Sequence, residues 1–354
     1  MRALVINPGS TSTKVAVYDG DTERASMTIR HTTKELEQFE ELIDQLDFRR
    51  RLILAFLEQE QIPLDSIEGF IGRGGLMKPV PSGIYEVNAK MVTDMGTCKY
   101  GQHASNLGGI LAKDLADRTR KNAFIADPVV VDEMSSVAKI SGLNGIVRRP
   151  LWHALNQKAV ARKYCATTKK SYEESMLIVA HLGGGISVGL HKYGRVTDVN
   201  NALDGDGPFT PERTGGLPVG SVYELAYSGQ YTLDQFQKLN HGFGGLVSYL
   251  GTNDAREVSK MIADGHVMAK RVVKAMVYQI AKEIGGLYAV TRNRLDAILI
   301  TGGLAYNDDV MQPLLEYLDH LGNIFVFPGE DEMEALNYNI QRLYSGDIEV
   351  QTYQ

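Results

Sequence analysis

The chain of 354 residues is 44% hydrophobic and 23% charged, contains two cysteines and carries a formal net charge of −6. A chain of this length favours two domains, and its acidic balance argues against a nucleic-acid-binding protein. The two cysteines lie outside any C-x-x-C pair, which excludes a disulfide framework or a cysteine zinc site, and the apolar runs are too short to span a bilayer. We therefore expect a soluble, cytoplasmic protein that is not associated with a membrane.

Two segments about half a chain length apart follow the same pattern. Residues 4–18 and residues 177–190 each predict a strand, a glycine-containing loop and a second strand. A third strand is expected after each of them, at 25–30 and at 195–199. Self-similarity at this spacing indicates a duplicated fold. The alternative is a pair of unrelated glycine-rich hairpins, which other α/β proteins also contain.

The segments between these openings alternate between helical and strand patterns. Thr32 and Glu35 predict a capping box ahead of a helix over residues 36–46. The further expected elements are strands at 67–71, 123–126, 297–300 and 325–327, and helices at about 102–118, at 267–288 and after residue 329. Several of these strands run directly into glycines, as in α/β proteins that bind ligands at the carboxyl ends of their strands. No linker composition marks the domain boundary, which we place near residue 150.

The first glycine-containing loop, residues 7–14, has the sequence Asn-Pro-Gly-Ser-Thr-Ser-Thr-Lys. Backbone N–H groups, hydroxyls and a lysine are donors that can surround phosphate oxygens, so we expect this loop to bind phosphate. A plain β-turn is the alternative, because Asn-Pro-Gly is also favourable turn chemistry. The chain has neither a Walker A loop nor the H-R-D and D-F-G motifs, which excludes P-loop and protein-kinase mechanisms.

Three further side chains suited to anion binding lie beside glycines or in polar loops: Arg73, His181 and Arg213. Singly, such residues are usually structural or solvated, but together they are the groups expected to clamp a negative charge. Asp127, at the end of a predicted strand, and the acidic residues 330–332 are the candidates for Mg²⁺ ligands. Residues 330–332 have an equally good alternative role as negative charge at the start of a helix. The residues by themselves thus indicate a phosphate- and metal-handling α/β protein.

Together these motifs resemble the acetate and butyrate kinase (acetokinase) family of the actin, Hsp70 and sugar kinase superfamily, and most closely its butyrate kinase branch. The likeness extends over essentially the whole chain and is carried by residues 7–14, 101–108, 127–133, 153–158, 181–185 and 201–214. It implies duplicated ribonuclease H-like domains, each an α/β domain with a mixed five-stranded sheet flanked by helices, with a cleft between them. The implied N-terminal domain comprises residues 1–150 and about 333–354 and handles phosphate and substrate. The implied nucleotide-binding domain comprises residues 151–332.

The resemblance also implies roles for individual residues. The implied catalytic residues are Arg73, Arg213, His181, His153, His103 and Asp127. Those implied to bind the nucleotide are Asn7, Ser10, Ser12, Lys14, Gly183, Gly184, Gly185, Asp254, Ala255, Arg256, Gly302, Gly303 and Asn307. The Mg²⁺ ion is expected near Asp127, Glu332 and Asn7, with Glu330 as the alternative to Glu332.

The implied activity is the reversible transfer of a phosphoryl group from ATP to butyrate, with ATP/ADP and Mg²⁺ as cofactors and a homodimer as the expected assembly. A carboxylate is already ionised at pH 7, so direct in-line transfer needs charge neutralisation rather than a general base. The alternatives within enzymes are a kinase for isobutyrate, propionate or acetate, or a sugar kinase, which would need a carboxylate base. Outside enzymes, the alternative is an actin- or Hsp70-like nucleotide switch.

Overall fold

A computed structural model describes the whole chain, residues 1–354, and groups it into two units. Unit 1 consists of Met1–Asp132 together with Asp331–Gln354, and unit 2 consists of Glu133–Glu330. The change from unit 1 to unit 2 falls after Asp132, which is earlier in the chain than the boundary placed near residue 150 from sequence.

Unit 1 is built on a seven-stranded sheet with the order β12-β5-β6-β4-β1-β2-β3. Strands β1, β2 and β3 form an antiparallel meander, whereas β4 and β6 continue the sheet parallel to β1. The short strands β5 and β12 extend the five expected strands at one edge. The bounds are β1 (Arg2–Pro8), β2 (Ser12–Asp19), β3 (Thr22–Arg30), β4 (Gly69–Arg73), β5 (Ile84–Glu86), β6 (Ala123–Ala126) and β12 (Val350–Thr352).

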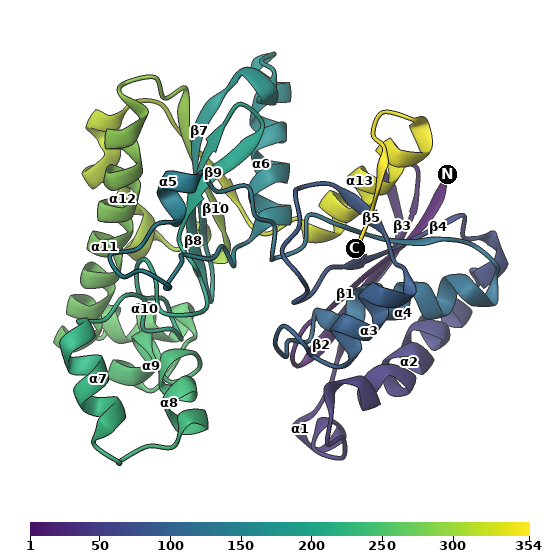
Figure 1. Cartoon of the computed structure of the whole chain (residues 1–354), viewed down its shortest axis with the longest axis horizontal. Helices are drawn as coiled ribbons and strands as arrows, with labels where there is room; N and C mark the ends of the chain where they lie inside the picture. Colours follow the sequence, from purple (N-terminus) through teal and green to yellow (C-terminus); the bar gives the residue numbers. More distant parts are fainter. The chain divides into compact units, whose positions relative to one another are not determined.

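Helices cover both faces of this sheet. Figure 1 shows α2 (Gln45–Gln59), α3 (Ala89–Gly96) and α4 (Asn106–Arg118) on one face and α13 (Glu332–Ser345) on the other. Although α13 follows the last strand of unit 2 in the chain, it packs on β1, β4 and β6. The remaining short elements of unit 1 are α1 (Thr33–Leu36), η1 (Leu42–Asp44) and η2 (Leu64–Ser66).

The helix expected over residues 36–46 is wrong, although its capping box is present. Thr32 and Glu35 cap each other as expected, but α1 ends at Leu36. The chain then restarts at η1 and continues into α2, where Glu41 and Asp44 form a second capping box. Glutamates follow at 37, 40 and 41, and like charges three and four residues apart destabilise a continuous helix. The capping box therefore located the helix start, whereas the apolar spacing gave the wrong length.

Unit 2 repeats the topology of unit 1 with the sheet order β11-β10-β7-β8-β9. Strands β7, β8 and β9 form the antiparallel meander, and β10 and β11 continue the sheet parallel to β7. This order matches β6-β4-β1-β2-β3 strand for strand, which accounts for the two similar sequence segments. The bounds are β7 (Met176–Leu182), β8 (Ile186–Lys192), β9 (Arg195–Val199), β10 (Ala297–Gly302) and β11 (Ile324–Pro328).

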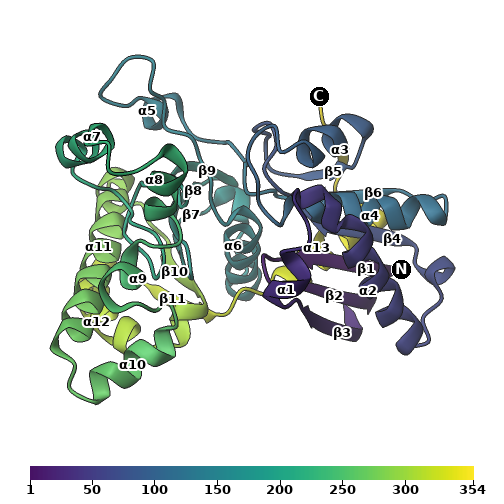
Figure 2. The ribbon, with the colours of Figure 1, turned by 90° about the horizontal axis from the view of Figure 1, so that it is seen from below.

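In Figure 2 the helix α6 (Ala154–Thr168) lies on one face of this sheet, and α11 (Val267–Thr291) and α12 (Asp308–Leu318) lie on the other. The inward side chains of α11 include Val272, Val273, Met276, Ile280 and Ile284, as its periodicity predicts. The remaining elements are α5 (Ser136–Lys139), η3 (Tyr172–Glu174), α7 (Val219–Tyr227), α8 (Leu233–Asn240), α9 (Gly245–Leu250), α10 (Ala255–Ala263), η4 (Gly303–Tyr306) and η5 (Asp319–Leu321). Even the 25-residue α11 lacks the apolar character that a membrane-crossing helix needs, and no other helix has it.

Candidate active site

Three polar residues lie at the ends of neighbouring parallel strands in unit 1. Asn7 lies near the end of β1, Arg73 ends β4, and Asp127 directly follows β6. The register pairs Ile6 with Gly72 and Arg73 with Ala126, so the three side chains start from adjacent strand ends. Because neighbouring strands are ~4.8 Å apart, this edge of the sheet concentrates an amide, a guanidinium and a carboxylate.

The helix α13 brings a fourth residue, Glu332, to Asn7 and Arg73. The Nδ2 of Asn7 donates to Oε2 of Glu332 at 2.7 Å, and Nη1 of Arg73 donates to the same oxygen at 2.9 Å. Glu332 is 7% exposed, so this charge-assisted contact is largely shielded from water. Of the two acids considered from sequence, the structure brings Glu332 to this cluster, whereas Glu330 belongs to unit 2.

Asp127 is held in a strained backbone conformation. Its φ is +39°, a region that residues with a side chain seldom adopt. Its Oδ1 accepts hydrogen bonds from the hydroxyl of Ser82 at 2.5 Å and from the N–H of Gly83 at 3.0 Å. Strain of this kind persists only where surrounding contacts fix it, and it is frequent at functional sites.

Asn7, Asp127 and Glu332 offer the hard oxygen donors that Mg²⁺ prefers. The chain contains no group of three or more His, Cys, Asp or Glu side chains arranged to hold a metal. A magnesium ion that arrives with a nucleotide needs only one or two protein carboxylates, because phosphates and water fill its other positions. The donor set therefore fits Mg²⁺ bound together with a phosphate chain.

The loop expected to bind phosphate is the tight turn between β1 and β2. The N–H of Gly9 donates to the carbonyl of Ser12 at 2.8 Å, which closes the turn and leaves Ser10 and Thr11 exposed at its tip. Lys14 is exposed on β2, in register with Asn7 on β1. The hydroxyls and the lysine thus lie beside the Asn7–Arg73 cluster of the same unit.

In unit 2, His181 lies near the end of β7 and is 1% exposed. Its Nδ1 lies 2.7 Å from Oδ1 of Asn156, and because an amide oxygen only accepts, Nδ1 carries a proton. The Nδ2 of Asn156 donates to the backbone carbonyl of Glu330 at 2.6 Å, which fixes the orientation of the amide. The Nε2 of His181 lies 3.9 Å from Oε1 of Glu330.

His153 packs flat against His181, and its Nδ1 lies 2.8 Å from the hydroxyl of Ser187. That hydroxyl accepts a hydrogen bond from Nε2 of Gln157 at 2.8 Å. The contact with Ser187 thus fixes the orientation of the His153 ring.

A third histidine, His191, contacts the Gln157 side chain. The Nε2 of His191 donates to Oε1 of Gln157 at 3.0 Å, and its Nδ1 lies 2.8 Å from the hydroxyl of Tyr172. Burial lowers the pKa of His191 well below the usual 6.5, and the charges of Lys158 and Arg162 lower it further. His191 is therefore neutral at pH 7 and holds the Gln157 amide in one orientation.

Arg213 crosses the glycine loop that follows β7. A Cβ at position 185 would lie 2.2 Å from Nη1 of Arg213, so only glycine permits this approach. Nη1 donates to the carbonyl of Ala202 at 2.7 Å, whereas the buried Nε has no hydrogen-bond partner. Burial lowers the pKa of Arg213, and the nearest carboxylate, that of Glu212, is 3.9 Å away. The structure thus brings Arg213 to Gly183–Gly185, the loop that also adjoins His181.

His103 lies in unit 1, just before α4. Its Nδ1 accepts a hydrogen bond from the N–H of Ser105 at 3.2 Å and lies 2.8 Å from the hydroxyl of the same residue. The ring is therefore held by its own segment of the chain. His103 and the stacked pair His153 and His181 belong to different units.

The two loops that the resemblance assigns to adenosine lie side by side in unit 2. The Nδ2 of Asn307 contacts the carbonyl of Ala255 at 3.4 Å and the hydroxyl of Ser259 at 3.0 Å. Asp254 caps α10, and its carboxylate accepts two hydrogen bonds from the Arg256 side chain, which lowers the pKa of Asp254 to about 2. Gly302 has a φ of +94°, and a Cβ there would lie 2.3 Å from the carbonyl of Leu182. Gly303 follows it as the first residue of η4.

Sequence reasoning gave no role to the residues that hold the candidate histidines. Asn156 and Gln157 lie within the motif 153–158, yet their contacts with His181 and Ser187 depend on the packing of α6 against β7 and β8. Ser82, which contacts Asp127, carried no sequence signal. The helical position of 156 and 157, one turn after His153, was the available hint.

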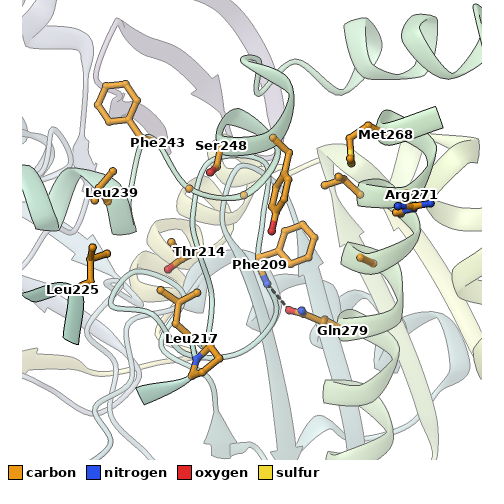
Figure 3. A pocket seen from close by; sticks show the side chains of 17 residues that line it. Phe209, Thr214, Leu217, Leu225, Leu239, Phe243, Ser248, Met268, Arg271 and Gln279 are labelled. Carbon is orange, nitrogen blue, oxygen red and sulfur yellow. Dashed lines mark hydrogen bonds between the residues drawn. The ribbon is translucent and has the colours of Figure 1, made fainter. Parts of the chain in front are cut away.

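A separate pocket of about 570 Å³ lies in unit 2 between α7, α8, α9 and α11 (Figure 3). Its lining is mainly apolar, and Arg271 is its one charged residue. The N–H of Phe209 donates to Oε1 of Gln279 at 3.1 Å at the base of the view. None of the residues expected to act in catalysis lines it.

Residues 137–332 match the model of the acetokinase family. The chain is 46% identical to butyrate kinase 2 of Clostridium acetobutylicum over 352 residues, covering 99% of each protein. Among solved structures, it is similar to an acetate kinase of Porphyromonas gingivalis (TM-score 0.78, 17% identity, 97% of this chain and 99% of the other). It is also similar to a propionate kinase of Francisella tularensis (TM-score 0.76, 18% identity, 95% and 98%).

The two structural similarities show the fold alone, which is the duplicated ribonuclease H-like fold of actin-like ATPases, as expected from sequence. The sequence similarity goes further, because it extends at 46% identity from one end of the chain to the other. The family model covers more than half of the same chain. The protein therefore belongs to the acetokinase family.

Proposed function

We propose that the protein transfers the γ-phosphoryl group of ATP to butyrate, forming butyryl phosphate and ADP in a reversible reaction. The observation that carries this proposal is the 46% identity over the full length to a protein named butyrate kinase 2. Arg73 at the end of β4 and Arg213 beside the loop after β7 agree with it, since both reactants are anions. A carboxylic acid with a pKa of about 4.3 is ionised at pH 7, so the protein needs no general base.

The physical problem of the reaction is charge repulsion. Two unit charges ~4 Å apart repel by about 4 kcal/mol at an effective dielectric constant of ~20. Unit 1 supplies Arg73, whose guanidinium is oriented by Glu332. Unit 2 supplies Arg213, whose nearest carboxylate, that of Glu212, lies 3.9 Å away, and the imidazole of His181. Groups of this kind stabilise a transferring phosphoryl group by position and charge.

Each unit has its own part in this proposal. Residues 7–14, Arg73, Asp127 and Glu332 of unit 1 bind phosphate and metal, and the loops around Asp254 and Asn307 of unit 2 bind adenosine. Asn7, Asp127 and Glu332 would hold Mg²⁺, which when bound neutralises charge on the phosphates. His181 donates its Nδ1 proton to Asn156, so its Nε2 can donate to a phosphoryl oxygen only when that nitrogen also carries a proton. The transfer is direct, without a phosphorylated form of the protein.

The proposal is tested with a hydroxylamine trap. The protein is incubated with ATP, Mg²⁺ and a panel of straight and branched acids of two to six carbons, and acyl hydroxamate is measured. A maximum at butyrate supports the proposal, and a maximum at acetate, propionate or isobutyrate assigns the substrate to that acid. Absence of hydroxamate with every acid, together with slow ATP hydrolysis, would show a nucleotide switch instead. A phosphorylated protein trapped from [γ-³²P]ATP without acid would contradict direct transfer.

We further propose that the protein is a homodimer that assembles through residues 216–243, which we call the α7–α8 segment. No residue of this segment is buried. Its large exposed apolar side chains are Leu217, Val219, Tyr223, Leu225, Tyr227, Tyr231, Leu233 and Phe243. Among 28 consecutive residues, only Glu224, Asp234 and Lys238 are charged.

The size and charge of the α7–α8 segment favour a second copy as its partner. A stable interface takes ~20–30 residues from each side, which this segment supplies without other elements. Interface centres are poor in charge and rich in tyrosine, as this segment is. A patch with one net negative charge can face its own copy with little repulsion. The segment also covers the pocket of Figure 3, to which Leu217, Leu225 and Phe243 contribute.

Light scattering on single variants tests this interface, because it measures their oligomeric state. Tyr227→Glu and Leu233→Glu should convert a dimer into folded monomers, because each places a charge in the apolar centre. Val137→Glu is the matched control, since Val137 is equally exposed in unit 2 but lies outside the segment. A monomeric wild-type chain, or dimeric variants, would exclude this interface.

A further inference from the structure

Beneath the loop expected to bind phosphate lies an arginine that the sequence did not single out. Arg49 belongs to α2 and is completely buried. Its Nη1 donates to the carbonyls of Gly9 and Ser12 at 3.0 and 2.9 Å and to the hydroxyl of Thr13 at 2.9 Å. Its Nε and Nη2 donate to Oε1 of Gln45 at 3.1 and 2.9 Å.

All of these acceptors are neutral, and no carboxylate forms an ion pair with Arg49. Burial lowers its pKa to about 10, with no neighbouring negative charge to oppose the change, so the side chain is still cationic at pH 7. A buried charge is costly when hydrogen bonds satisfy it but no opposite charge accompanies it. Fixing a turn requires only hydrogen-bond donors, which a neutral side chain also provides. The retained charge therefore calls for an anion.

The loop above Arg49 directs three of its carbonyls to that side chain. The carbonyls of Gly9, Ser10 and Ser12 point to Arg49, and that of Thr11 accepts from the N–H of His31 at 2.9 Å. The N–H groups of Ser10 and Thr11 have no acceptor in the protein, and both residues are exposed. Successive N–H groups without a protein acceptor can bind an oxyanion through their positive potential.

His31, the second titratable group beneath the loop, adds no charge of its own. The ring of His31 lies 2.9 Å from the hydroxyl of Thr13, on the same hydroxyl that accepts from Arg49. Burial lowers the pKa of His31, and the charge of Arg49 lowers it further, so this ring is neutral at pH 7. Arg49 is thus the only charged member of the network beneath the turn.

We propose that Arg49 is a positioning residue for the phosphate chain of the nucleotide: it turns the carbonyls of residues 9, 10 and 12 inward and supplies from below the positive charge that the bound phosphates neutralise. This inference rests on the proposed function in requiring a nucleotide, but not on the identity of the acid. It predicts an effect on phosphate binding that is separate from the effect on folding.

The test compares ADP with adenosine, which lacks the phosphates. The affinity for ADP is divided by the affinity for adenosine, and this ratio is measured by calorimetry for wild type, Arg49→Gln and Arg49→Lys. Arg51→Gln is the matched control, because Arg51 lies two residues away on α2 and its side chain is 70% exposed. Arg49→Gln should lower the ratio at least about tenfold, which is the effect of one unit charge acting across several ångströms of protein. Arg49→Lys and Arg51→Gln should keep the ratio within about threefold of wild type.

The outcomes separate this inference from the proposed function. If Arg49→Gln lost affinity for ADP and adenosine equally, or for neither, Arg49 would be a structural residue only. If Arg49→Gln failed to fold, a tenfold lower ratio in folded Arg49→Lys would equally contradict the role of the charge. If the wild-type chain bound neither ligand, the proposed function would fail and this inference with it.

Discussion

The rings of His153 and His181 stack with their centroids 3.7 Å apart and their planes inclined by 11°. Each ring is anchored through Nδ1, His181 by Asn156 and His153 by Ser187. Stacking and the two anchors together fix the orientation of both rings.

Loss of the Asn156 anchor should impair catalysis without unfolding unit 2. Asn156→Leu removes the acceptor for Nδ1 of His181 and frees the ring to rotate, and we expect kcat to fall by about 10- to 100-fold. The hydroxamate assay measures the rate, and a thermal melt reports the fold. Asn156→Asp is the matched variant, because it keeps an oxygen for His181 and should retain more activity. Equal rates for Asn156→Leu and wild type would show that His181 needs no anchor.

Removal of the Arg73 charge should affect the chemical step most. In Arg73→Met, the phosphoryl group loses a cation, and by analogy with other phosphoryl-transfer arginines kcat should fall on the order of 10³-fold. Arg24→Met serves as the control, since Arg24 forms only an exposed ion pair with Asp19. Steady-state kinetics with ATP and butyrate measure kcat and KM for both variants. A change confined to KM would assign Arg73 to ground-state binding alone.

A methyl group at position 185 should act through Arg213. In Gly185→Ala the new Cβ would overlap the guanidinium and displace it. We expect kcat to fall at least about tenfold, and the double variant Gly185→Ala with Arg213→Met to be no slower than Arg213→Met alone. Gly142→Ala, where a Cβ meets nothing within 4 Å, is the control. Additive losses in the double variant would mean that Gly185 acts independently of Arg213.

The stability of unit 2 should depend on a buried ion pair. Lys158, 1% exposed at its side chain, lies 2.9 Å from Glu133. Glu133→Gln leaves the lysine charge unpaired and should lower the free energy of unfolding by about 3–5 kcal/mol. Adding Lys158→Met should recover much of that loss. The single tryptophan, buried Trp152, reports denaturation of this unit by its fluorescence. A Glu133→Gln protein as stable as wild type would show that the pair contributes no net stability.

The C-terminal strand should stabilise unit 1 in a pH-dependent manner. The hydroxyl of Tyr353 donates to Asp94 at 2.8 Å, and this contact, helped by Lys90 and Lys99, lowers the pKa of Asp94 below the usual 3.8. Because the folded pKa is lower than the unfolded one, the stabilisation is present above pH ~4 and is lost as pH falls through the folded value. Tyr353→Phe should therefore cost about 1.5–3 kcal/mol at pH 7 and less at pH 3. Calorimetry at both pH values measures it, and a pH-independent cost would exclude Asp94 as the cause.

Much of the fold follows from local sequence patterns. The strands at 123–126 and 195–199 have the expected bounds, and the capping box at Thr32 is present. Apolar runs and glycines specify such elements locally, so these elements can be predicted without the tertiary structure. The extent of the helix after Thr32 and the burial of Arg49 were not legible. The helix ends early because of the like charges at 37, 40 and 41, which the spacing of apolar residues does not reflect. The burial of Arg49 depends on the loop that packs against α2, which neither the spacing nor the number of apolar residues encodes.

The roles of the acidic residues 330–332 could not be predicted from the local sequence. The sequence by itself placed three carboxylates after a predicted strand and left the choice between Glu330 and Glu332 open. In the tertiary structure, Asp331 has a φ of +40°, and the chain turns there from unit 2 into α13 of unit 1. Glu330 consequently lies near His181, and Glu332 near Asn7 and Arg73. A left-handed backbone at an aspartate carries no sequence signature, because only contacts from distant parts of the chain hold it in place.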